Sequence, residues 1–262
     1  MSQRRPGLRI LITNDDGVDA PGIAVMREIA ATLSDDVWVV APDGNQSGAA
    51  HRFTFGRELG LEQREPRVYA VVGGSPADCV VAAMTHVCKD FKPQLVLSGI
   101  NNGQNLGDIL NCSGTVAGAR EGALHGALGI GISQAVNYEV GTEIDWSNSR
   151  RFAAGVVSGL LDEVTRRDVY FNVNIPFGPA EDVTGVRVVP AQRFSHSPMA
   201  YYPSDNDGKF FIAIPRTPTP LDPAHDFHLL MHAAAITVTP LMLQQTDYGV
   251  AEELDGRLRL RG

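Results

Sequence analysis

Six short apolar runs recur along the first 175 residues, and longer segments with helical character follow several of them. A short continuous apolar run is typical of a strand buried on both faces of a parallel sheet. Alternation of such strands with helices indicates βαβ units, so we expect an α/β fold around a doubly wound, mostly parallel sheet. The predicted strands are Leu8 to Ile12, Val37 to Ala41, Val68 to Val72, Leu95 to Ser98, Gly129 to Ser133 and Val169 to Ile175.

Local signals place four helices between these strands. Proline in the first turn and Ser or Asp at the start favour helix N-termini at Pro21, Ser75 and Ser113. The predicted helices run from Pro21 to about Leu33, from Ser75 to about Cys88, from Ser113 to about His125, and from about Asn148 to Val164.

The chain changes character after Pro176. Nine prolines lie between Pro176 and Pro223, with aromatic residues among them, which predicts an extended hairpin or arm. Arms with exposed aromatic side chains often bury them on a partner subunit. A last strand is predicted from Ala235 to Leu241. We expect one domain over residues 1–262, with a core at about 8–176 and an extension, exchanged between subunits, at about 177–262.

Charge and composition restrict the partners. The 262 residues carry a net charge of −8, which argues against binding to duplex nucleic acid or to an anionic membrane. Three cysteines without CxxC spacing predict free thiols rather than disulfides or a zinc site. The sequence shows neither a signal peptide nor an apolar stretch long enough to span a membrane. We therefore expect a cytoplasmic protein.

Oxygen-bearing side chains follow the predicted strands. Asp15 and Asp16 come directly after the first strand, Ser47 follows the second, and Asn101 follows the fourth. The carboxyl ends of parallel strands lie at one edge of the sheet, where α/β proteins bind ligands. Adjacent carboxylates repel unless a proton or a cation lies between them, and oxygen ligands favour Mg²⁺ or Mn²⁺. Helix N-termini near Ser75 and Ser113 offer amides for a phosphate, so the pattern predicts a phosphoryl hydrolase.

Five motifs in this order resemble the SurE survival-protein family of metal-dependent 5′(3′)-nucleotidases. The resemblance covers most of the first 135 residues and resumes near Asp226 and at residues 236–241. The motifs are Asn14-Asp15-Asp16-Gly17, Asn45-Gln46-Ser47-Gly48, Gly74-Ser75-Pro76-Ala77-Asp78, Asn101-Asn102-Gly103-Gln104-Asn105 and Ser113-Gly114-Thr115-Val116.

The resemblance implies a specific site. One divalent ion per subunit, Mg²⁺ or Mn²⁺, is expected on Asp15, Asp16, Ser47 and Asn101, and Asp15 and Asp16 are also the expected catalytic residues. Substrate and phosphate are expected at Asn14, Gly48, Asn105, Ser113, Gly114 and Thr115. The resemblance also implies a Rossmann-like, three-layer core with a C-terminal arm that joins subunits into a homodimer or homotetramer. The implied reaction is hydrolysis of nucleoside 5′-monophosphates, and of 3′-monophosphates as well, to nucleoside and phosphate.

The sequence departs from the family pattern at a few positions. Ile109 stands where an acid is usual, Cys112 where an aromatic residue or histidine is common, and Ser75 where threonine is usual. The first two changes bear on base or sugar preference more than on metal binding.

Other classes fit less well. A phosphorylation-receiver module also has paired acids after its first strand, but receivers are about half this length. A dinucleotide-dependent oxidoreductase would need GxGxxG where this chain has Asn-Asp-Asp-Gly. A broader phosphatase or exopolyphosphatase, and a nucleotide-binding protein without catalysis, remain as alternatives.

Overall fold

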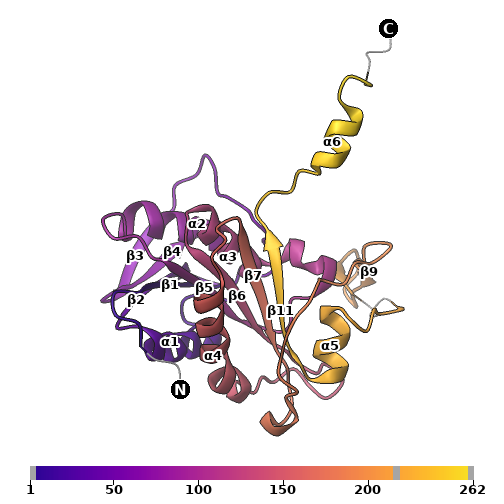
Figure 1. Cartoon of the computed structure of the whole chain (residues 1–262), viewed down its shortest axis with the longest axis horizontal. Coiled ribbons are helices and arrows are strands. Elements are labelled where there is room, and N and C mark those ends of the chain that lie inside the picture. The colour runs from indigo at the N-terminus through magenta and orange to yellow at the C-terminus, as the bar shows by residue number, and fades with distance from the viewer. Residues whose placement is uncertain (1–3, 215–218, 259–262) are drawn as a thin grey trace.

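A single large sheet organises the chain in the computed structural model, which describes residues 4–214 and 219–258. Within these residues, nine strands pair in the order β3-β4-β2-β1-β5-β6-β7-β11-β8 (Figure 1). Their bounds are β1 Arg9–Thr13, β2 Asp36–Pro42, β3 Gly60–Glu65, β4 Val68–Val72, β5 Leu95–Asn102, β6 Leu128–Gln134, β7 Val169–Ile175, β8 Val186–Val188 and β11 Ile236–Met242.

The centre of the sheet is parallel, which confirms the predicted fold class. Strands β4, β2, β1, β5, β6 and β7 all pair in parallel. Only β3 and β11 pair antiparallel to their neighbours β4 and β7, and β8 lies parallel to β11 at the far edge. All six strands predicted in the first 175 residues are present, as is the closing strand near residue 236.

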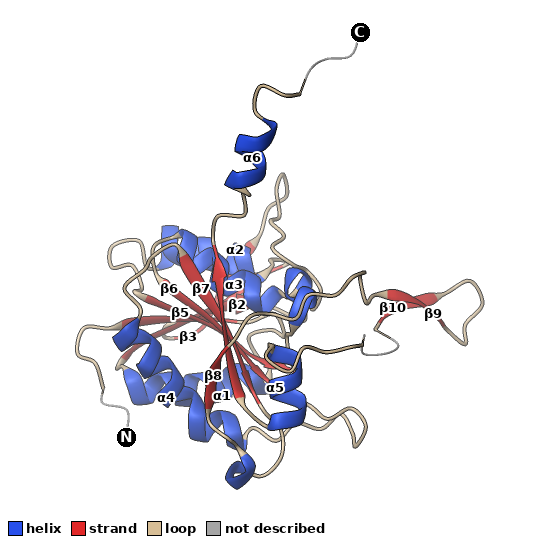
Figure 2. Ribbon diagram, turned by 45° about the vertical axis from the view of Figure 1, so that its right-hand side comes forward, coloured by secondary structure: helices blue, strands red, loops and turns tan. Residues whose placement is uncertain are grey.

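Helices cover both faces of the sheet, so the core has three layers with the sheet in the middle (Figure 2). Helices α1 (Pro21–Leu33) and α4 (Ser147–Glu163) lie on one face. Helices α2 (Pro76–Ala82) and α3 (Gly114–Leu124) lie on the other. Side chains alternate between the faces of a strand, so Ile10 and Ile12 pack under α1 while Leu11 packs under α2.

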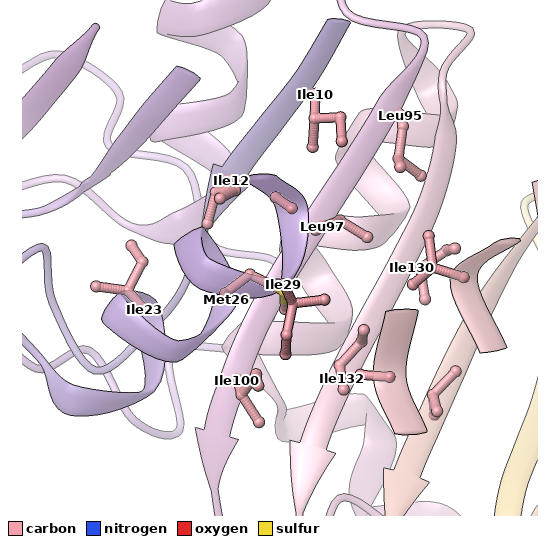
Figure 3. Packing of buried hydrophobic residues seen from close by; sticks show 14 of the residues in the cluster. Ile10, Ile12, Ile23, Met26, Ile29, Leu95, Leu97, Ile100, Ile130 and Ile132 are labelled. Atoms are coloured by element: carbon pink, nitrogen blue, oxygen red, sulfur yellow. The ribbon is translucent and has the colours of Figure 1, made fainter. Parts of the chain in front are cut away.

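The larger core lies under α1 and α4. Figure 3 shows Ile23, Met26 and Ile29 of α1 lying over the isoleucine and leucine side chains of β1, β5 and β6. Leu97 of β5 is fully buried in this cluster. Burial of a Leu or Ile side chain contributes about 1.5–3 kcal/mol, so this layer holds α1 in place directly after the acidic turn.

The sheet order creates a crevice at the end of β1. The chain leaves β1 to form β2 on one side and returns, after β4, to form β5 on the other. Such a switch in strand order separates the loops that leave neighbouring strands and opens a ligand site at their carboxyl ends. The loops after β1, β2 and β5 therefore border one crevice.

Some elements differ from the sequence-based expectation. Strand β5 extends through Asn101 and Asn102, which were expected in a loop. Helix α2 continues as a short π-helix at Ala83–Val87, and a 3₁₀-helix forms at Gly107–Cys112. Strands β3 and β8 were not predicted because every residue in both is exposed, which gives no apolar run.

The residues after β7 form several separate elements. Strands β9 (Ala200–Pro203) and β10 (Phe210–Ala213) make the expected hairpin, which projects from the body of the molecule (Figure 2). Helix α5 (Asp226–Ala233) packs near β11, and α6 (Tyr248–Leu254) extends away beyond the end of β11 (Figure 1). Part of the predicted 177–262 extension thus completes the central sheet through β8 and β11.

Cys79, Cys88 and Cys112 are free thiols. Among the described residues, no helix combines the length and the apolar character that crossing a membrane would need.

The core assignment predicts unequal effects for two leucines. Leu97→Ala should lower the free energy of unfolding by about 2–5 kcal/mol, because it leaves a cavity in the fully buried layer. Leu124→Ala, at the 51% exposed end of α3, should change it by less than about 1 kcal/mol. Urea denaturation followed by circular dichroism measures both values. Equal losses would contradict the assignment of this core.

Candidate active site

The acidic pair follows β1 in a tight turn. Asn14 is fully buried; its Nδ2 donates to the Gly17 carbonyl at 2.8 Å, and its Oδ1 accepts from the Gly17 amide at 3.2 Å. Gly17 has a φ of 109°, which favours glycine. Asn14 therefore shapes the turn that presents Asp15 and Asp16, and its expected role toward substrate stays a prediction.

The N-terminus of α3 meets Asp15. Thr115 Oγ1 donates to Asp15 Oδ1 at 2.6 Å, and the amides of Gly114 and Thr115 also hydrogen-bond this carboxylate. A Cβ atom on Gly114 would lie 2.7 Å from Asp15 Cβ, so only glycine allows this approach. Ser113 Oγ caps the helix by accepting from the Val116 amide at 3.1 Å. The structure thus brings three of the predicted phosphate residues to the acidic pair.

Burial shapes the charge of the pair. Asp15 is 4% exposed, and burial raises its pKa despite the hydrogen bonds from Thr115 and the α3 amides. Burial and the adjacent Asp15 carboxylate raise the pKa of Asp16 from 3.8 to about 6. One buried and one partly buried acid that both resist ionisation mark a place where a bound cation is favoured.

Strand β5 brings its end to the same turn. The Asn102 amide donates to Asp16 Oδ2 at 3.3 Å. Asn101 Nδ2 donates to the Gly103 carbonyl at 2.7 Å, which fixes the orientation of the amide group. Its Oδ1 accepts no hydrogen bond from the described part of the chain, and it remains available as an oxygen ligand.

The loop after β2 approaches from the other side. The Gln46 amide donates to the Asp15 carbonyl at 2.6 Å, and Ser47, the next residue, is exposed. The Ser47 amide donates to Asn45 Oδ1 at 2.8 Å, which tightens the turn around it. Gly48 has a φ of 75°, so its glycine is needed for the turn itself. The structure therefore sets the Ser47 loop directly against the acidic turn.

Asp78 holds the far part of this loop. Its carboxylate accepts from the Thr54 amide at 3.1 Å, from Thr54 Oγ1 at 2.8 Å and from the Ser75 amide at 2.9 Å. Partial burial opposes ionisation, but these hydrogen bonds outweigh it and lower the pKa of Asp78. Ser75 Oγ accepts from the Asp78 amide, which completes a capping box. The capping box therefore occupies the N-terminus of α2. Of these two helices, it is α3 whose N-terminus contacts Asp15.

A second anchor joins the loop to α3. His51 Nε2 lies 2.8 Å from Glu121 Oε2, and Arg120 Nη1 lies 2.7 Å from His51 Nδ1. Glu121 is 5% exposed and also contacts His125 Nε2 at 3.1 Å. Glu121 was not among the residues predicted from the sequence. Its only signal is an acid in a helix that is otherwise mostly small and apolar.

Asn105 is buried, and several hydrogen bonds hold it in place. Its amide donates to Asn174 Oδ1 at 2.9 Å, and its Nδ2 donates to Ser133 Oγ at 2.9 Å. Asn172 and Asn174 both donate to its carbonyl. The side chain anchors its loop to β6 and β7, and its expected contact with phosphate stays a prediction. Asp226, fully buried, holds the same loop by accepting from the Gly107 amide at 2.9 Å.

Two of the departures from the family pattern, Ile109 and Cys112, line the same cavity. Ile109 and Cys112 line a space of about 460 Å³ together with residues 193–199 of the C-terminal segment. The Cys112 carbonyl also accepts from the Ala50 amide at 3.2 Å. This cavity adjoins the capped start of α3, because Cys112 directly precedes Ser113.

The candidate cation ligands contain only two ionisable groups. Among the residues that the structure describes, no group of three or more His, Cys, Asp or Glu side chains is arranged to hold a metal ion. A cation at the acidic turn would therefore depend on neutral oxygens such as those of Ser47 and Asn101.

Comparison with known proteins points to a single family. The family model "Survival protein SurE" matches residues 10–197. A protein named 5′-nucleotidase SurE from Nitrobacter winogradskyi is 38% identical over 96% of this chain and 100% of its own length. A protein of the same name from Azorhizobium caulinodans is 40% identical over 92% of this chain and 94% of its own.

A solved structure shares the whole fold. The crystal structure of the SurE protein from Aquifex aeolicus superposes with a TM-score of 0.80 at 32% identity, over 94% of this chain and 98% of that one. Sequence and architecture agree over nearly the full length, and the chain belongs to the SurE family.

Proposed function

We propose that this chain is a metal-dependent phosphomonoesterase that hydrolyses nucleoside 5′-monophosphates, and 3′-monophosphates as well, to nucleoside and phosphate. One observation carries the proposal: the N-terminus of α3 and the Asp15-Asp16 pair meet at one point, where a phosphate and a cation can be held together. The name 5′-nucleotidase, which the similar proteins bear, supports the same substrate class.

The proposed cation ligands are Asp15, Asp16, Ser47 and Asn101. All four offer oxygen, and all four lie on loops or strand ends that hydrogen bonds join at the acidic turn. This donor set suits one Mg²⁺ or Mn²⁺ per subunit. When bound, such an ion polarises a phosphoryl oxygen and lowers the pKa of a coordinated water.

The start of α3 is the proposed phosphate site. Ser113, Gly114 and Thr115 lie there beside Asp15, and the helix end adds a partial positive charge that favours an anion. The exposed turn at Ser47-Gly48 borders the same point from the loop after β2. We place Asn14 and Asn105 behind these groups, where they fix the acidic turn and the loop after β5.

We propose that hydrogen bonds hold the Asp15 carboxylate more firmly than the Asp16 carboxylate. Thr115 and the α3 amides fix the Asp15 carboxylate, which suits a positioning role at the reacting phosphate. Asp16 is only partly buried and accepts a single long bond from the Asn102 amide. The Asp16 side chain is therefore the less constrained of the two, which suits a catalytic role beside a bound ion.

The assembly is proposed to be a homodimer or homotetramer in the cytoplasm. The β9–β10 hairpin exposes Tyr201, Tyr202, Phe210 and Phe211, each at least half exposed. Aromatic side chains that project from the body in this way gain stability when a second subunit covers them.

The function is tested by replacing each acid with its amide. Asp15→Asn and Asp16→Asn should each lower kcat/KM for nucleoside monophosphates with Mg²⁺ or Mn²⁺ by at least about a hundredfold. Both variants should stay folded, because Asn keeps the shape of the side chain and its Oδ1 can still accept from Thr115 at position 15 and from the Asn102 amide at position 16. Asp19→Asn, an exposed acid three residues further on, is the matched control.

Phosphate release is measured over a panel of 5′- and 3′-nucleotides, other phosphomonoesters and short polyphosphates, with and without EDTA. Strong turnover of non-nucleotide esters or polyphosphate would instead support a broad phosphatase or exopolyphosphatase. Nucleotide binding without release by the wild-type protein would support a binding-only role. Normal turnover in both Asn variants would refute the site.

The pKa of Asp16 predicts how metal binding depends on pH. Between about pH 4 and 6 the metal-free folded protein keeps a proton that the unfolded chain has released. The contribution of Asp16 to folding stability therefore falls as pH rises through this window. Below pH 6 a cation must displace that proton from Asp16. The affinity for the cation should therefore fall about tenfold for each unit by which the pH is lowered. Thermal unfolding with and without Mn²⁺ should show a larger stabilisation at pH 7.5 than at pH 5. An equal shift at both values would contradict the prediction.

The hairpin predicts a change of oligomeric state. Tyr202 and Phe211 pair across β9 and β10 and are 51% and 60% exposed. The double variant Tyr202→Asp/Phe211→Asp should dissociate the assembly, because charges cannot be buried in an aromatic interface. Light scattering after size-exclusion chromatography measures the mass, and Phe55→Asp, at an 87% exposed loop position, is the control. A monomeric wild-type protein would refute this assembly.

A further inference from the structure

A cluster of charged and histidine side chains lies between α3 and the loop after β2, outside the acidic turn. Glu121 is at its centre, with 7% of its side chain exposed. Its Oε2 lies 2.8 Å from His51 Nε2, and its Oε1 lies 3.1 Å from His125 Nε2. Arg120 Nη1 lies 2.7 Å from His51 Nδ1, and Arg120 Nη2 donates to the Leu243 carbonyl at 3.3 Å. The proposed cation and phosphate sites use none of these side chains.

Arg120 determines where the His51 ring carries its proton. A guanidinium group has only donors, so His51 Nδ1 must accept the hydrogen bond from Arg120. With Nδ1 as the acceptor, the ring is neutral and its proton lies on Nε2, which donates to Glu121. Both ring nitrogens are therefore used, and the ring is fixed in one tautomer and one orientation.

The hydrogen bonds of Glu121 keep the His51 ring in this place. A nearly buried carboxylate is costly to leave without hydrogen bonds, and each Glu121 oxygen has one imidazole as its partner. If the His51 ring swung out, one Glu121 oxygen and one Arg120 donor would lose this partner together. The His51 side chain is therefore held firmly, although it belongs to a loop.

The backbone before His51 requires such a hold. Ala50 has a φ of 52°, a left-handed conformation that is unfavourable for a residue other than glycine. Such a conformation persists only when the surrounding structure fixes it. The Ala50 amide donates to the Cys112 carbonyl at 3.2 Å, and His51, the next residue, is fixed by Glu121. These contacts set the path of the chain on one side of Ser47.

Ser47 lies between this hold and the acidic turn. The amide of Gln46, directly before Ser47, donates to the Asp15 carbonyl at 2.6 Å, and His51 follows Ser47 on the other side. We propose that Glu121 is a positioning residue for the cation, because through His51 it fixes the Ser47 hydroxyl relative to Asp15. This role rests on the proposed function, since Ser47 is one of the proposed cation ligands. Helix α3 then positions the phosphate with its first turn and the Ser47 hydroxyl with Glu121, about two turns further on.

The test measures Mn²⁺ binding to the full-length protein without nucleotide, from the electron paramagnetic resonance signal of the free ion. His51→Phe removes both ring hydrogen bonds and should raise the Kd for Mn²⁺ about tenfold. His51→Gln keeps an N–H donor for Glu121 and should stay within about threefold of the wild-type Kd. His86→Phe, at an exposed histidine outside the cluster, is the matched control and should bind as the wild type does. Equal Kd values for His51→Phe and His86→Phe would overturn the proposal.

A double-mutant cycle checks that the effect passes through Ser47. Ser47→Ala should itself weaken Mn²⁺ binding, and addition of His51→Phe should then raise the Kd by less than about twofold more. Additive losses would show that His51 acts by another path and would overturn the proposal. At saturating Mn²⁺, His51→Phe should keep kcat and the KM for nucleotide within about threefold of the wild-type values. A lower kcat at every Mn²⁺ concentration, with an unchanged Kd, would indicate a merely structural role and would also overturn it.

The tautomer of His51 can be measured in the wild-type protein. Long-range nitrogen–proton correlation NMR spectra should show a neutral ring with its proton on Nε2, and His51→Gln assigns the signal. A proton on Nδ1 would contradict the proposal even if His51→Phe did not fold. A His51-dependent Kd without phosphate release by the wild type would refute the phosphatase activity and support this role. A wild-type protein that binds no Mn²⁺ would refute both.

Discussion

The contact between Asp15 and the start of α3 is the interaction on which the active-site geometry depends. It joins two segments that are 100 residues apart, through Thr115 Oγ1 and the amides of the first helical turn. Gly114 makes the approach sterically feasible because it has no Cβ atom. Strand β1, paired with β5, leads directly into the turn that carries Asp15. Because the carboxylate is buried, the helix amides stabilise its negative charge on one side, and the proposed cation would balance it on the other. The proposed phosphate chemistry depends on this arrangement.

The parallel core was readily predictable, whereas the sheet edges were not. Buried parallel strands need apolar side chains on both faces, so each of the central strands leaves a continuous apolar run in the sequence. Strands β3 and β8 lie at the two edges and are exposed throughout, so neither periodicity nor hydrophobicity marks them. The helix starts at Pro21, Ser75 and Ser113 were predicted because capping chemistry is local.

The candidate site was predicted in part for the same reason. Residues that follow strands converge in any parallel sheet, so Asp15, Ser47 and Asn101 were expected at one edge, and the hydrogen bonds around them join their loops there. What the sequence did not reveal is which polar groups support the others. Asn172 and Asn174 alternate with apolar residues in β7 and bind the Asn105 carbonyl, and Glu121 holds His51. Such partners are distant in the chain and carry no local signal.

The connection from β2 to β3 has two parts of very different freedom. Its first part is held at Gln46 by the Asp15 carbonyl, at His51 by Glu121 and at Thr54 by Asp78. Beyond Thr54 the chain is exposed, with Phe55 at 87%. Insertions or deletions in this outer part leave the Ser47 hydroxyl in place, whereas a single added residue between Gln46 and Thr54 shifts it relative to both acids. We therefore expect the outer part of this connection to tolerate changes in length, because new surface can be added there without moving the Ser47 hydroxyl relative to Asp15 and Asp16.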